Sequence, residues 1–372
     1  MIIGRILRGN DKLKDELTKI FQVATVFIGT IVGAGLASGK EITEFFTKYG
    51  LKSFLGIFIC GIFYIIMCLI ISSISIKHNL DSYSDVINLI SPNILGKFTG
   101  FVTTFFLISS ASIILAGSGA LINQFFGIPK VIGSLIMICI AVFFLLRGTD
   151  GLIEINSFIV PGLVFTISLI TILYFLFCKD TVSLSNISSF KPQKSGIAIS
   201  TLLYAGYNTL SASGVIVPLS TTMKKPKTMF IGIICGALGL TILCSMINLL
   251  LTINQPYIYK YEIPLLLVAN RFGTIIQAIL LVIIWLEMFS TEVSDVYSIS
   301  KTLEKTFNIS FKKAIFPVIA VAFIISQFGF GNLINKLYPL FGLLSLIFIS
   351  QCIYFFFKDK SIYFFYSRKH EP

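Results

Sequence analysis

The feature that most constrains this chain is its succession of long apolar blocks, which are separated by short polar connectors. Blocks of roughly 18–25 apolar residues have the length that an α-helix needs to cross the ~30 Å hydrocarbon core of a bilayer. Apolar residues make up 55% of the 372 residues and charged residues only 12%, whereas soluble domains carry about a quarter charged residues. The sequence therefore predicts an all-α polytopic membrane protein whose solvent is lipid.

Ten such blocks are predicted to span the membrane. They lie near residues 20–48, 54–76, 98–126, 131–146, 152–178, 196–222, 228–253, 272–300, 314–328 and 333–357. An even number of spans puts both termini on one side of the membrane. Most of the 29 Lys and Arg residues fall in segments that are cytoplasmic when the termini are cytoplasmic. We therefore expect a multi-pass protein with both termini in the cytoplasm.

The lengths of the spans repeat after about 175–180 residues, so that the first five spans match the last five. Because five is an odd number, the two halves enter the membrane from opposite sides, an arrangement typical of secondary transporters. We expect two inverted five-helix repeats, formed by residues 1–180 and 181–372.

Glycines cluster in the first span of each half. Gly33 and Gly35 interrupt span 1, Gly206 lies in span 6, and Ala37-Ser38-Gly39 and Ala212-Ser213-Gly214 occupy corresponding positions. A glycine inside a helix costs about 1 kcal/mol relative to alanine, and unwound backbone at membrane depth is tolerated where it lines a cavity. The pattern predicts that helices 1 and 6 are broken. The alternative is that these glycines only allow close packing of helices.

Two segments resemble a known family. The core G-T-I-V-G-A-G-L-A-S-G-K-E-I-T-E-F-F within Val23–Gly50, and Leu337–Gly342 in the last span, are similar to the YkvI-type membrane proteins of Gram-positive bacteria. That family is grouped with the amino acid–polyamine–cation transporters, which have the LeuT fold. The resemblance implies a LeuT-like protein of the bacterial cytoplasmic membrane. It also implies a substrate site between the breaks in helices 1 and 6, flanked by spans 3 and 8.

The candidate substrate-binding residues come from the two predicted breaks and from span 3. They are Gly33, Ala34, Gly35, Ser38, Ser112, Gly206, Tyr207, Asn208 and Thr209. The Asn208 amide both donates and accepts hydrogen bonds and suits a substrate contact. Ser112 either faces the cavity or bonds to its own helix.

The resemblance also implies a site for a coupling ion. In sodium-coupled members the ion lies between span 1 carbonyls and span 8 hydroxyls, and the matching positions make a Na⁺ candidate of Gly29, Val32, Glu287, Ser290 and Thr291. Other members use a proton, often through a lysine in span 5, but no lysine lies between residues 152 and 177.

Ionisable residues inside a span are functional candidates by default. Glu287, with Asp295 nearer the cytoplasm, is a candidate proton carrier, or else a neutral acid that is hydrogen-bonded within the bundle. The coupling ion is therefore Na⁺ or H⁺, and no other cofactor is expected.

Glu41 and Glu44 follow the predicted break in span 1. Lys40 and Glu44 have the i,i+4 spacing of an ion pair on a helix, which we expect at an exposed mouth. Alternatively, both glutamates line an outer vestibule, where Glu41 attracts a substrate ammonium group or a cation.

Signatures of enzymes are missing from the sequence. His78 and His370 fall in a loop and a tail, so that no His-based triad or zinc site is predicted at membrane depth, and there is no Walker A motif. The net charge of +12 lies between the spans and does not predict nucleic-acid binding. The leading prediction is a symporter of an amino acid or similar zwitterion, coupled to sodium or protons and working by alternating access. A ligand-binding sensor subunit without turnover is the alternative, and a channel is a third.

Overall fold

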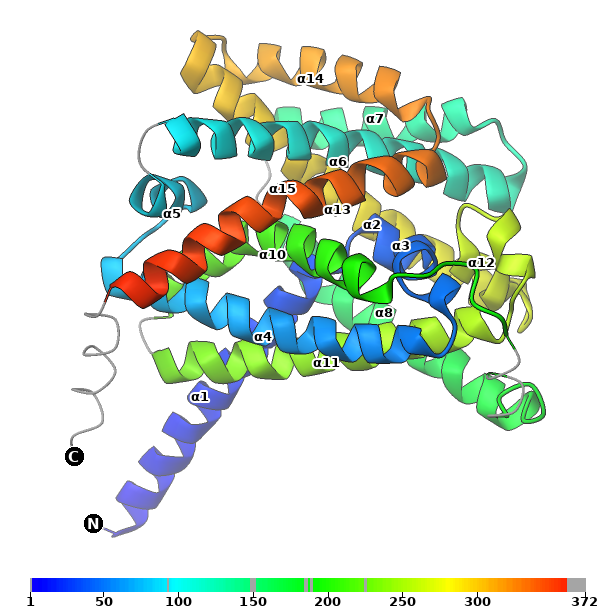
Figure 1. The fold of residues 1–372 in the computed structure, drawn as a ribbon, viewed down its shortest axis with the longest axis horizontal. Coiled ribbons are helices and arrows are strands. Elements are labelled where there is room, and N and C mark those ends of the chain that lie inside the picture. Colours follow the sequence, from blue (N-terminus) through cyan, green and yellow to red (C-terminus); the bar gives the residue numbers. More distant parts are fainter. Residues whose placement is uncertain are drawn as a thin grey trace.

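The computed structural model describes the backbone of residues 2–91, 94–147, 152–183, 187, 190–223 and 226–359, and every regular element in these ranges is a helix (Figure 1). Ten helices of 16 residues or more overlap the ten predicted spans. They are α1 (Ile2–Ile31), α4 (Lys52–His78), α6 (Ile94–Phe126), α7 (Lys130–Arg147), α8 (Leu152–Phe177), α10 (Ile197–Thr222), α11 (Pro226–Thr252), α13 (Thr274–Phe307), α14 (Phe311–Ser326) and α15 (Phe330–Lys358).

Short helices join the long ones or continue a broken one. They are α2 (Ala34–Ala37), α3 (Lys40–Phe45), η1 (Thr47–Tyr49), α5 (Tyr83–Ile90), η2 (Tyr257–Lys260) and α12 (Pro264–Asn270). Three of them, α2, α3 and η1, follow α1 directly and make up the rest of the first predicted span.

Within the described residues, seven helices are long and apolar enough to cross a membrane: α4, α6, α7, α8, α11, α13 and α15. The remaining three long helices are too short or too polar to meet this requirement, each for a different reason. The 16 residues of α14 rise only about 24 Å, and α10 carries many hydroxyl-bearing residues. Helix α1 carries the charged residues Lys14, Asp15, Glu16 and Lys19. The chain is therefore a multi-pass membrane protein, and the number of ten spans stays a prediction.

The outer surface of the helices is apolar. Only 28% of the spanning window of α7 is buried inside the protein, and large side chains such as Ile132 and Phe143 are exposed. Apolar surface on this scale marks a contact with lipid rather than with water.

The long helices pack as two groups. In one group α1, α4, α10 and α11 pack against one another, and in the other α6, α7, α13 and α14 do so. Figure 1 shows α4 and α11 along one side of the molecule and α6, α7 and α14 along the opposite side. Between the groups, α15 contacts both α10 and α6, and α8 contacts α1, α11 and α13.

Glycines allow close approach of helices within both groups. A side chain at Gly236 of α11 would come within 2.9 Å of the Phe27 ring and 3.0 Å of the Ala24 carbonyl oxygen on α1. A side chain at Gly133 of α7 would come within 2.9 Å of the Gly119 Cα on α6. Such small residues bring backbones together in membranes, where packing rather than the hydrophobic effect drives helix association.

The predicted break in span 1 is confirmed. Helix α1 ends at Ile31, and Val32 and Gly33 are not helical. The Gly33 amide donates to the Ile31 carbonyl at 2.9 Å rather than to the carbonyl of Gly29, as a continuing helix would require. Gly39 joins α2 to α3 with φ +79°, a left-handed conformation that glycine adopts without a Cβ penalty.

The predicted break in span 6 is wrong, because α10 is continuous from Ile197 to Thr222. Gly206 faces α15, where a side chain would come within 3.1 Å of the Gly342 carbonyl oxygen and would press on Ser345. In return, a side chain at Gly342 would overlap the backbone of Leu203. Gly206 therefore serves close helix packing, the alternative interpretation of the glycine clusters.

Candidate functional site

The short helices after the break in span 1 carry a buried carboxylate into the interior. Glu41 lies in the first turn of α3, and its side chain extends back over α2, where a Cβ atom at Gly35 would overlap the carboxylate. A Cβ atom at Gly33 would meet nothing within 4 Å. Gly35 therefore makes room for Glu41, whereas Gly33 belongs to the unwound backbone.

Three tyrosines surround the Glu41 carboxylate. Tyr207 of α10 donates a hydrogen bond of 2.6 Å to Oε2, and the Tyr204 and Tyr338 hydroxyls lie beside the same carboxylate. The Tyr207 and Tyr338 rings stack with centroids 4.6 Å apart, and the Tyr204 ring meets the Tyr207 ring edge-on at 5.4 Å. We call Glu41 with Tyr204, Tyr207 and Tyr338 the Glu41 cage.

The Glu41 cage holds no cation from the described residues. Glu41 is 3% exposed, and the neighbouring Lys40 directs its ammonium group to Glu44 instead, at 3.6 Å. The Tyr204 hydroxyl is buried and has no hydrogen-bond partner among the described residues. A buried carboxylate with only hydroxyl partners can hold a proton or accept a cation, and tyrosine rings also attract cations. The predicted open vestibule therefore does not contain Glu41, because the turn at Gly39 directs α3 inward.

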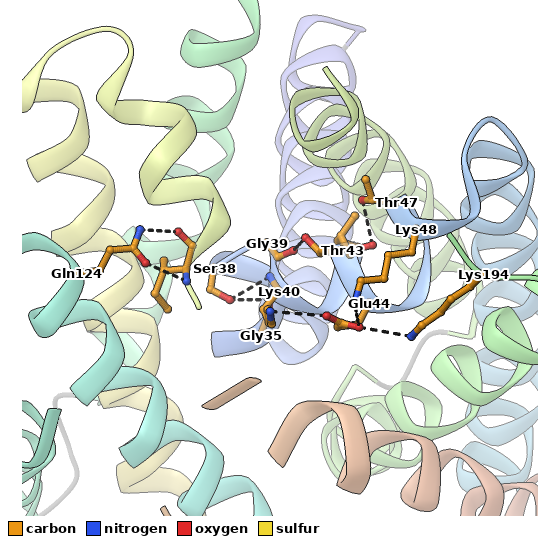
Figure 2. A network of polar contacts seen from close by, with 12 residues as sticks. Gly35, Ser38, Gly39, Lys40, Thr43, Glu44, Thr47, Lys48, Gln124 and Lys194 are labelled. Atoms are coloured by element: carbon orange, nitrogen blue, oxygen red, sulfur yellow. Dashed lines mark hydrogen bonds and ion pairs between the residues drawn. The ribbon is translucent and has the colours of Figure 1, made fainter. Parts of the chain in front are cut away.

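Glu44 lies at the centre of a lysine cluster (Figure 2). Besides Lys40, it pairs with Lys48 one turn further on, and Lys194 approaches Oε2 at 3.4 Å from the segment before α10. The Lys48 carbonyl accepts hydrogen bonds from the amides of Gln193 and Lys194 at 2.7 and 3.1 Å. The predicted Lys40–Glu44 ion pair is thus present, but it is buried rather than at an exposed mouth. We call Glu44 with Lys40, Lys48 and Lys194 the lysine cluster, and it ties α3 to the start of α10.

A cavity of about 220 Å³ lies beside the lysine cluster. Its lining residues come from α3, from α10 with the segment before it, and from α15, and they include Glu44, Phe45, Lys194, Leu203 and Pro339. Small-molecule sites usually measure about 300–1,000 Å³, so that this cavity suits only a small solute.

Phe45 contacts both the cavity and the Glu41 cage. The ring lines the cavity and packs against the rings of Tyr204 and Tyr207 at centroid distances of 5.2 and 6.2 Å. Pro339 lines the cavity as well, and it directly follows Tyr338 of the cage. Phe45 and Pro339 therefore connect the wall of the cavity to the Glu41 cage.

Several predicted substrate contacts instead hold the local backbone. Ser38 donates to the Gly35 carbonyl at 2.8 Å and accepts from the Lys40 amide at 3.2 Å (Figure 2). The Ser38 carbonyl accepts from the Leu265 amide at 3.0 Å. Gln124 of α6 forms two hydrogen bonds with the backbone of Ile263 close by. Ala34 is buried within α2, the short helix that directly precedes Ser38.

Polar candidates on α6 and α10 bond to their own helices. The hydroxyls of Ser112 and Thr209 donate to carbonyls one turn earlier, at 2.7 and 2.8 Å, and the Asn208 amide donates to the Tyr204 carbonyl at 3.1 Å. Of the predicted substrate-binding set, Gly35 and Tyr207 are the residues that the structure brings to Glu41.

The candidate sodium ligands come from the end of α1 and the break after it, and from α13. On α13 the Thr291 hydroxyl donates to the Glu287 carbonyl at 3.0 Å, so that two of the predicted ligands bond to each other. Glu287 and Ser290 are buried. Helix α13 packs against α2, the helix that follows Gly29 and Val32. The described residues contain no group of three or more His, Cys, Asp and Glu side chains placed to hold a metal ion, and the Na⁺ shell stays a prediction.

Sequence reasoning missed Glu292 on α13. This side chain is wholly buried, and neither carboxylate oxygen has a hydrogen-bond partner among the described residues. Asp295, three residues later, is 8% exposed, and its Oδ2 also lacks a partner there. The rule that marks ionisable residues inside a span would have found Glu292 had it been applied to the whole of span 8.

Comparison with known proteins places the chain in a family of membrane proteins. No family model matches the sequence. The uncharacterized membrane protein YkvI of Bacillus subtilis (strain 168) is 32% identical over 332 residues, which cover 89% of this chain and 94% of that protein. The uncharacterized protein YyaD of the same organism is 24% identical over 326 residues, 86% of this chain and 92% of its own length.

Solved structures share the fold at low sequence identity. A Na⁺-coupled sialic acid symporter has a TM-score of 0.65 at 15% identity and covers 90% of this chain and 78% of its own. A mutant of the manganese transporter of Eremococcus coleocola has a TM-score of 0.63 at 13% identity with the same coverage. The nucleobase-cation-symport-1 transporter Mhp1 has a TM-score of 0.59 at 14% identity, over 89% of this chain and 77% of its own. The chain therefore belongs to the YkvI-like family of multi-pass membrane proteins and has the LeuT fold of secondary transporters.

Proposed function

We propose that this protein is a secondary active transporter that carries a small solute with a cationic group, such as an amino acid or similar zwitterion, together with Na⁺ or H⁺. The observation that carries the proposal is the buried Glu41 carboxylate beside the break in helix 1, which no cation among the described residues neutralises. Leaving a carboxylate charged and unpaired at this depth is costly. A substrate ammonium group would supply the missing charge and would meet the tyrosine rings of the cage.

The lysine cluster provides a complementary attraction for the other end of a zwitterion. Three lysines face the single carboxylate of Glu44, so that the cluster carries excess positive charge beside the cavity. A solute carboxylate entering the cavity would be drawn to Lys194, whose side chain is 45% exposed. Opposite charges on the two sides of Phe45 would orient a zwitterion with its ammonium group towards Glu41.

Alternating access would move the two helix groups relative to each other. The Glu41 cage joins α3 and α10, which belong with α1 and α11, to α15, which also contacts α6. A rocking motion between the groups would open the cage first to one side and then to the other. Phe45 would swing aside when the solute passes from the cavity to Glu41.

The helix pairings support the two inverted repeats, 1–180 and 181–372. Helix α1 packs closely against α11, and α10 packs closely against α4. In a twofold repeat, α1 corresponds to α10 and α4 corresponds to α11. The pair of α1 and α11 therefore corresponds to the pair of α10 and α4, as such a repeat requires. We therefore propose ten spans in a bacterial cytoplasmic membrane with both termini in the cytoplasm.

Transport and ligand binding can be tested together in purified protein. A thermal-shift screen of amino acids, with and without sodium, identifies the ligand, and counterflow in proteoliposomes then measures turnover. In the Glu41→Gln variant, affinity should fall at least about 30-fold, since removing one partner of a buried charge pair costs about 2–5 kcal/mol. Glu262→Gln, which alters an ion pair to Lys130 at the surface, is the matched control.

Each of three results would overturn one part of the proposal. Full affinity in Glu41→Gln would remove the ammonium site. Ligand-induced stabilisation without any counterflow would make the protein a ligand-binding sensor instead of a transporter. Uptake that responds to neither a sodium gradient nor a pH gradient would remove the coupling.

A further inference from the structure

A second cavity, of about 10 Å³, lies among α4, α10 and α11 and adjoins the Glu41 cage. Tyr64 of α4 and Tyr204 of α10 line it, and Tyr204 is itself a member of the cage. Phe46, the residue directly after α3, lines the cavity as well and packs edge-on against the Tyr204 ring, with centroids 4.9 Å apart. This cavity shares no lining residue with the one beside the lysine cluster and is distinct from it.

The two tyrosines that line this cavity have incomplete hydrogen bonding. Tyr64 is 3% exposed and Tyr204 is 2% exposed, and neither hydroxyl has a hydrogen-bond partner among the described residues. The Tyr64 ring packs edge-on against Phe27 of α1, with centroids 6.4 Å apart. Buried polar groups in folded proteins are nearly always hydrogen-bonded. Two open hydroxyls at the wall of one cavity therefore indicate a polar partner that both of them share.

Thr241 of α11 adds a third hydroxyl to the wall of the cavity. It donates a hydrogen bond of 2.7 Å to the Ala237 carbonyl of its own helix, which leaves its oxygen able to accept a hydrogen bond. A Cβ atom at Gly61 of α4 would overlap this Thr241 oxygen. The missing side chain at Gly61 therefore makes room for the hydroxyl between α4 and α11.

The size and the chemistry of the cavity limit its occupant. A space of about 10–15 Å³ is sufficient for one water molecule, which also needs about two to four polar partners. The lining offers three hydroxyls and, as weaker partners, the thiols of Cys60 and Cys244. A hard cation fits less well, because Ca²⁺ or Mg²⁺ takes about six or more oxygen ligands and no carboxylate or imidazole lines the cavity.

We propose that this cavity binds one water molecule, which bridges the Tyr64 and Tyr204 hydroxyls. The water can accept a hydrogen bond from Tyr64 and donate to the oxygens of Tyr204 and Thr241. The bridge fixes the orientation of Tyr204, whose ring meets the Tyr207 ring edge-on at 5.4 Å. Tyr207 is the residue that donates to the Glu41 carboxylate. The water is therefore a positioning element of the Glu41 cage, one aromatic ring behind the donor.

The site belongs to one of the two helix groups. Helices α4, α10 and α11, which carry its three hydroxyls, pack against one another together with α1. A rocking motion between the groups therefore carries the water along without opening its cavity. The water site for this reason does not depend on the proposed transport function, and the two can be tested apart.

Radiolytic hydroxyl-radical labelling of the full-length protein in lipid nanodiscs detects the water without a substrate. Radicals that form from a bound water modify the side chains beside it, even where bulk solvent does not reach. Cys60 lines the cavity and Cys68, further along α4, does not, although both are buried free thiols. Cys60 should therefore be modified several times faster than Cys68. In the double variant Tyr64→Phe/Tyr204→Phe the rate at Cys60 should fall to that of Cys68.

A double-mutant cycle tests the bridge through stability. Tyr64→Phe and Tyr204→Phe should each lower the melting temperature by at least about 2 °C, because each leaves the water and the other hydroxyl with one partner fewer. The double variant should melt no lower than the less stable single variant, since it replaces both partners by apolar rings. Tyr259→Phe is the matched control and should not lower the melting temperature. The Tyr259 hydroxyl is also buried without a partner among the described residues, but it does not line this cavity.

Two results would overturn the water site. Equal labelling of Cys60 and Cys68 in the wild type would show that no water lies in the cavity. Single variants that raise the melting temperature, with additive effects in the double variant, would show that no water bridges the two hydroxyls. If Tyr204→Phe does not fold, Tyr64→Phe decides alone, because it should lower both the melting temperature and the labelling of Cys60. Glu41→Gln should keep the fast labelling of Cys60 even though it loses ligand binding, so that a failure of the transport proposal leaves this site intact.

Discussion

The Tyr207 hydroxyl donates a hydrogen bond of 2.6 Å to the Glu41 carboxylate, and this bond joins α3 to α10 across 166 positions of sequence. The bond holds α3, which turns inward after the break in span 1, against the continuous helix α10. The bond therefore links the broken part of the fold to the unbroken part at the place where we propose that a substrate ammonium group binds.

Replacing Tyr207 by phenylalanine should weaken both the fold and ligand binding. The variant keeps the ring stacked on Tyr338 but removes the donor to a buried carboxylate, which costs about 1–3 kcal/mol. Thermal unfolding of the ligand-free protein measures the loss. Tyr259→Phe is the matched control, because the buried Tyr259 hydroxyl has no hydrogen-bond partner among the described residues. Its removal breaks no bond there and should not destabilise the protein. Equal effects of the two variants would contradict the role of the bond.

A side chain at position 35 should displace Glu41 from its cage. In Gly35→Ala the new methyl group would overlap the Glu41 carboxylate, and overpacking of this kind costs about 1–3 kcal/mol. The double variant Gly35→Ala/Glu41→Ala should recover part of that stability, because it removes the overlapping group. A double-mutant cycle measures the coupling. Additive effects would show that Glu41 does not lie against Gly35. Gly33→Ala, with nothing within 4 Å of the new Cβ, serves as the stability control.

The members of the lysine cluster should differ in their importance for stability. The Lys48 side chain is 18% exposed and that of Lys194 is 45% exposed, and both pair with the buried Glu44. Exposed ion pairs contribute about 0–1 kcal/mol, whereas loss of a buried partner costs several times more. Lys48→Met should therefore destabilise the protein more than Lys194→Met in chemical denaturation. The reverse order would mean that the segment before α10, rather than α3, depends on the cluster.

Most of the helical architecture could be predicted from the sequence, because a membrane span is recognised by the length of its apolar block. All ten long helices overlap predicted spans, and the chain unwinds at Gly33, where an added Cβ atom would meet nothing within 4 Å. The same signal failed at Gly206. Its meaning depends on Gly342 and Ser345 of α15, more than 130 residues away, and one sequence does not show that contact.

The candidate site was harder to predict than the fold, since it depends on the directions in which individual side chains point. Glu41 follows the break by only a few residues, which suggested an exposed mouth, but the left-handed turn at Gly39 directs its side chain into the protein. Its partner Tyr207 was a candidate for another reason, the expected break in span 6. Glu292, which sequence reasoning missed, differs from both, because its position inside a span would have been enough to identify it.

Two glycines of α10 offer the sharpest contrast between packing and helix propensity. Gly206 faces α15, where a Cβ atom would press on Ser345 and come within 3.1 Å of the Gly342 carbonyl oxygen, whereas a Cβ atom at Gly214 would meet nothing within 4 Å. Gly206→Ala should therefore destabilise the protein by about 1–3 kcal/mol through overpacking. Gly214→Ala should stabilise it by up to about 1 kcal/mol, because alanine favours the helix. Thermal unfolding of the two variants in the same detergent gives the comparison. If both alanines stabilise the protein, Gly206 is not required for the contact between α10 and α15. The original interpretation of Gly206 as a point where the helix unwinds would then be favoured.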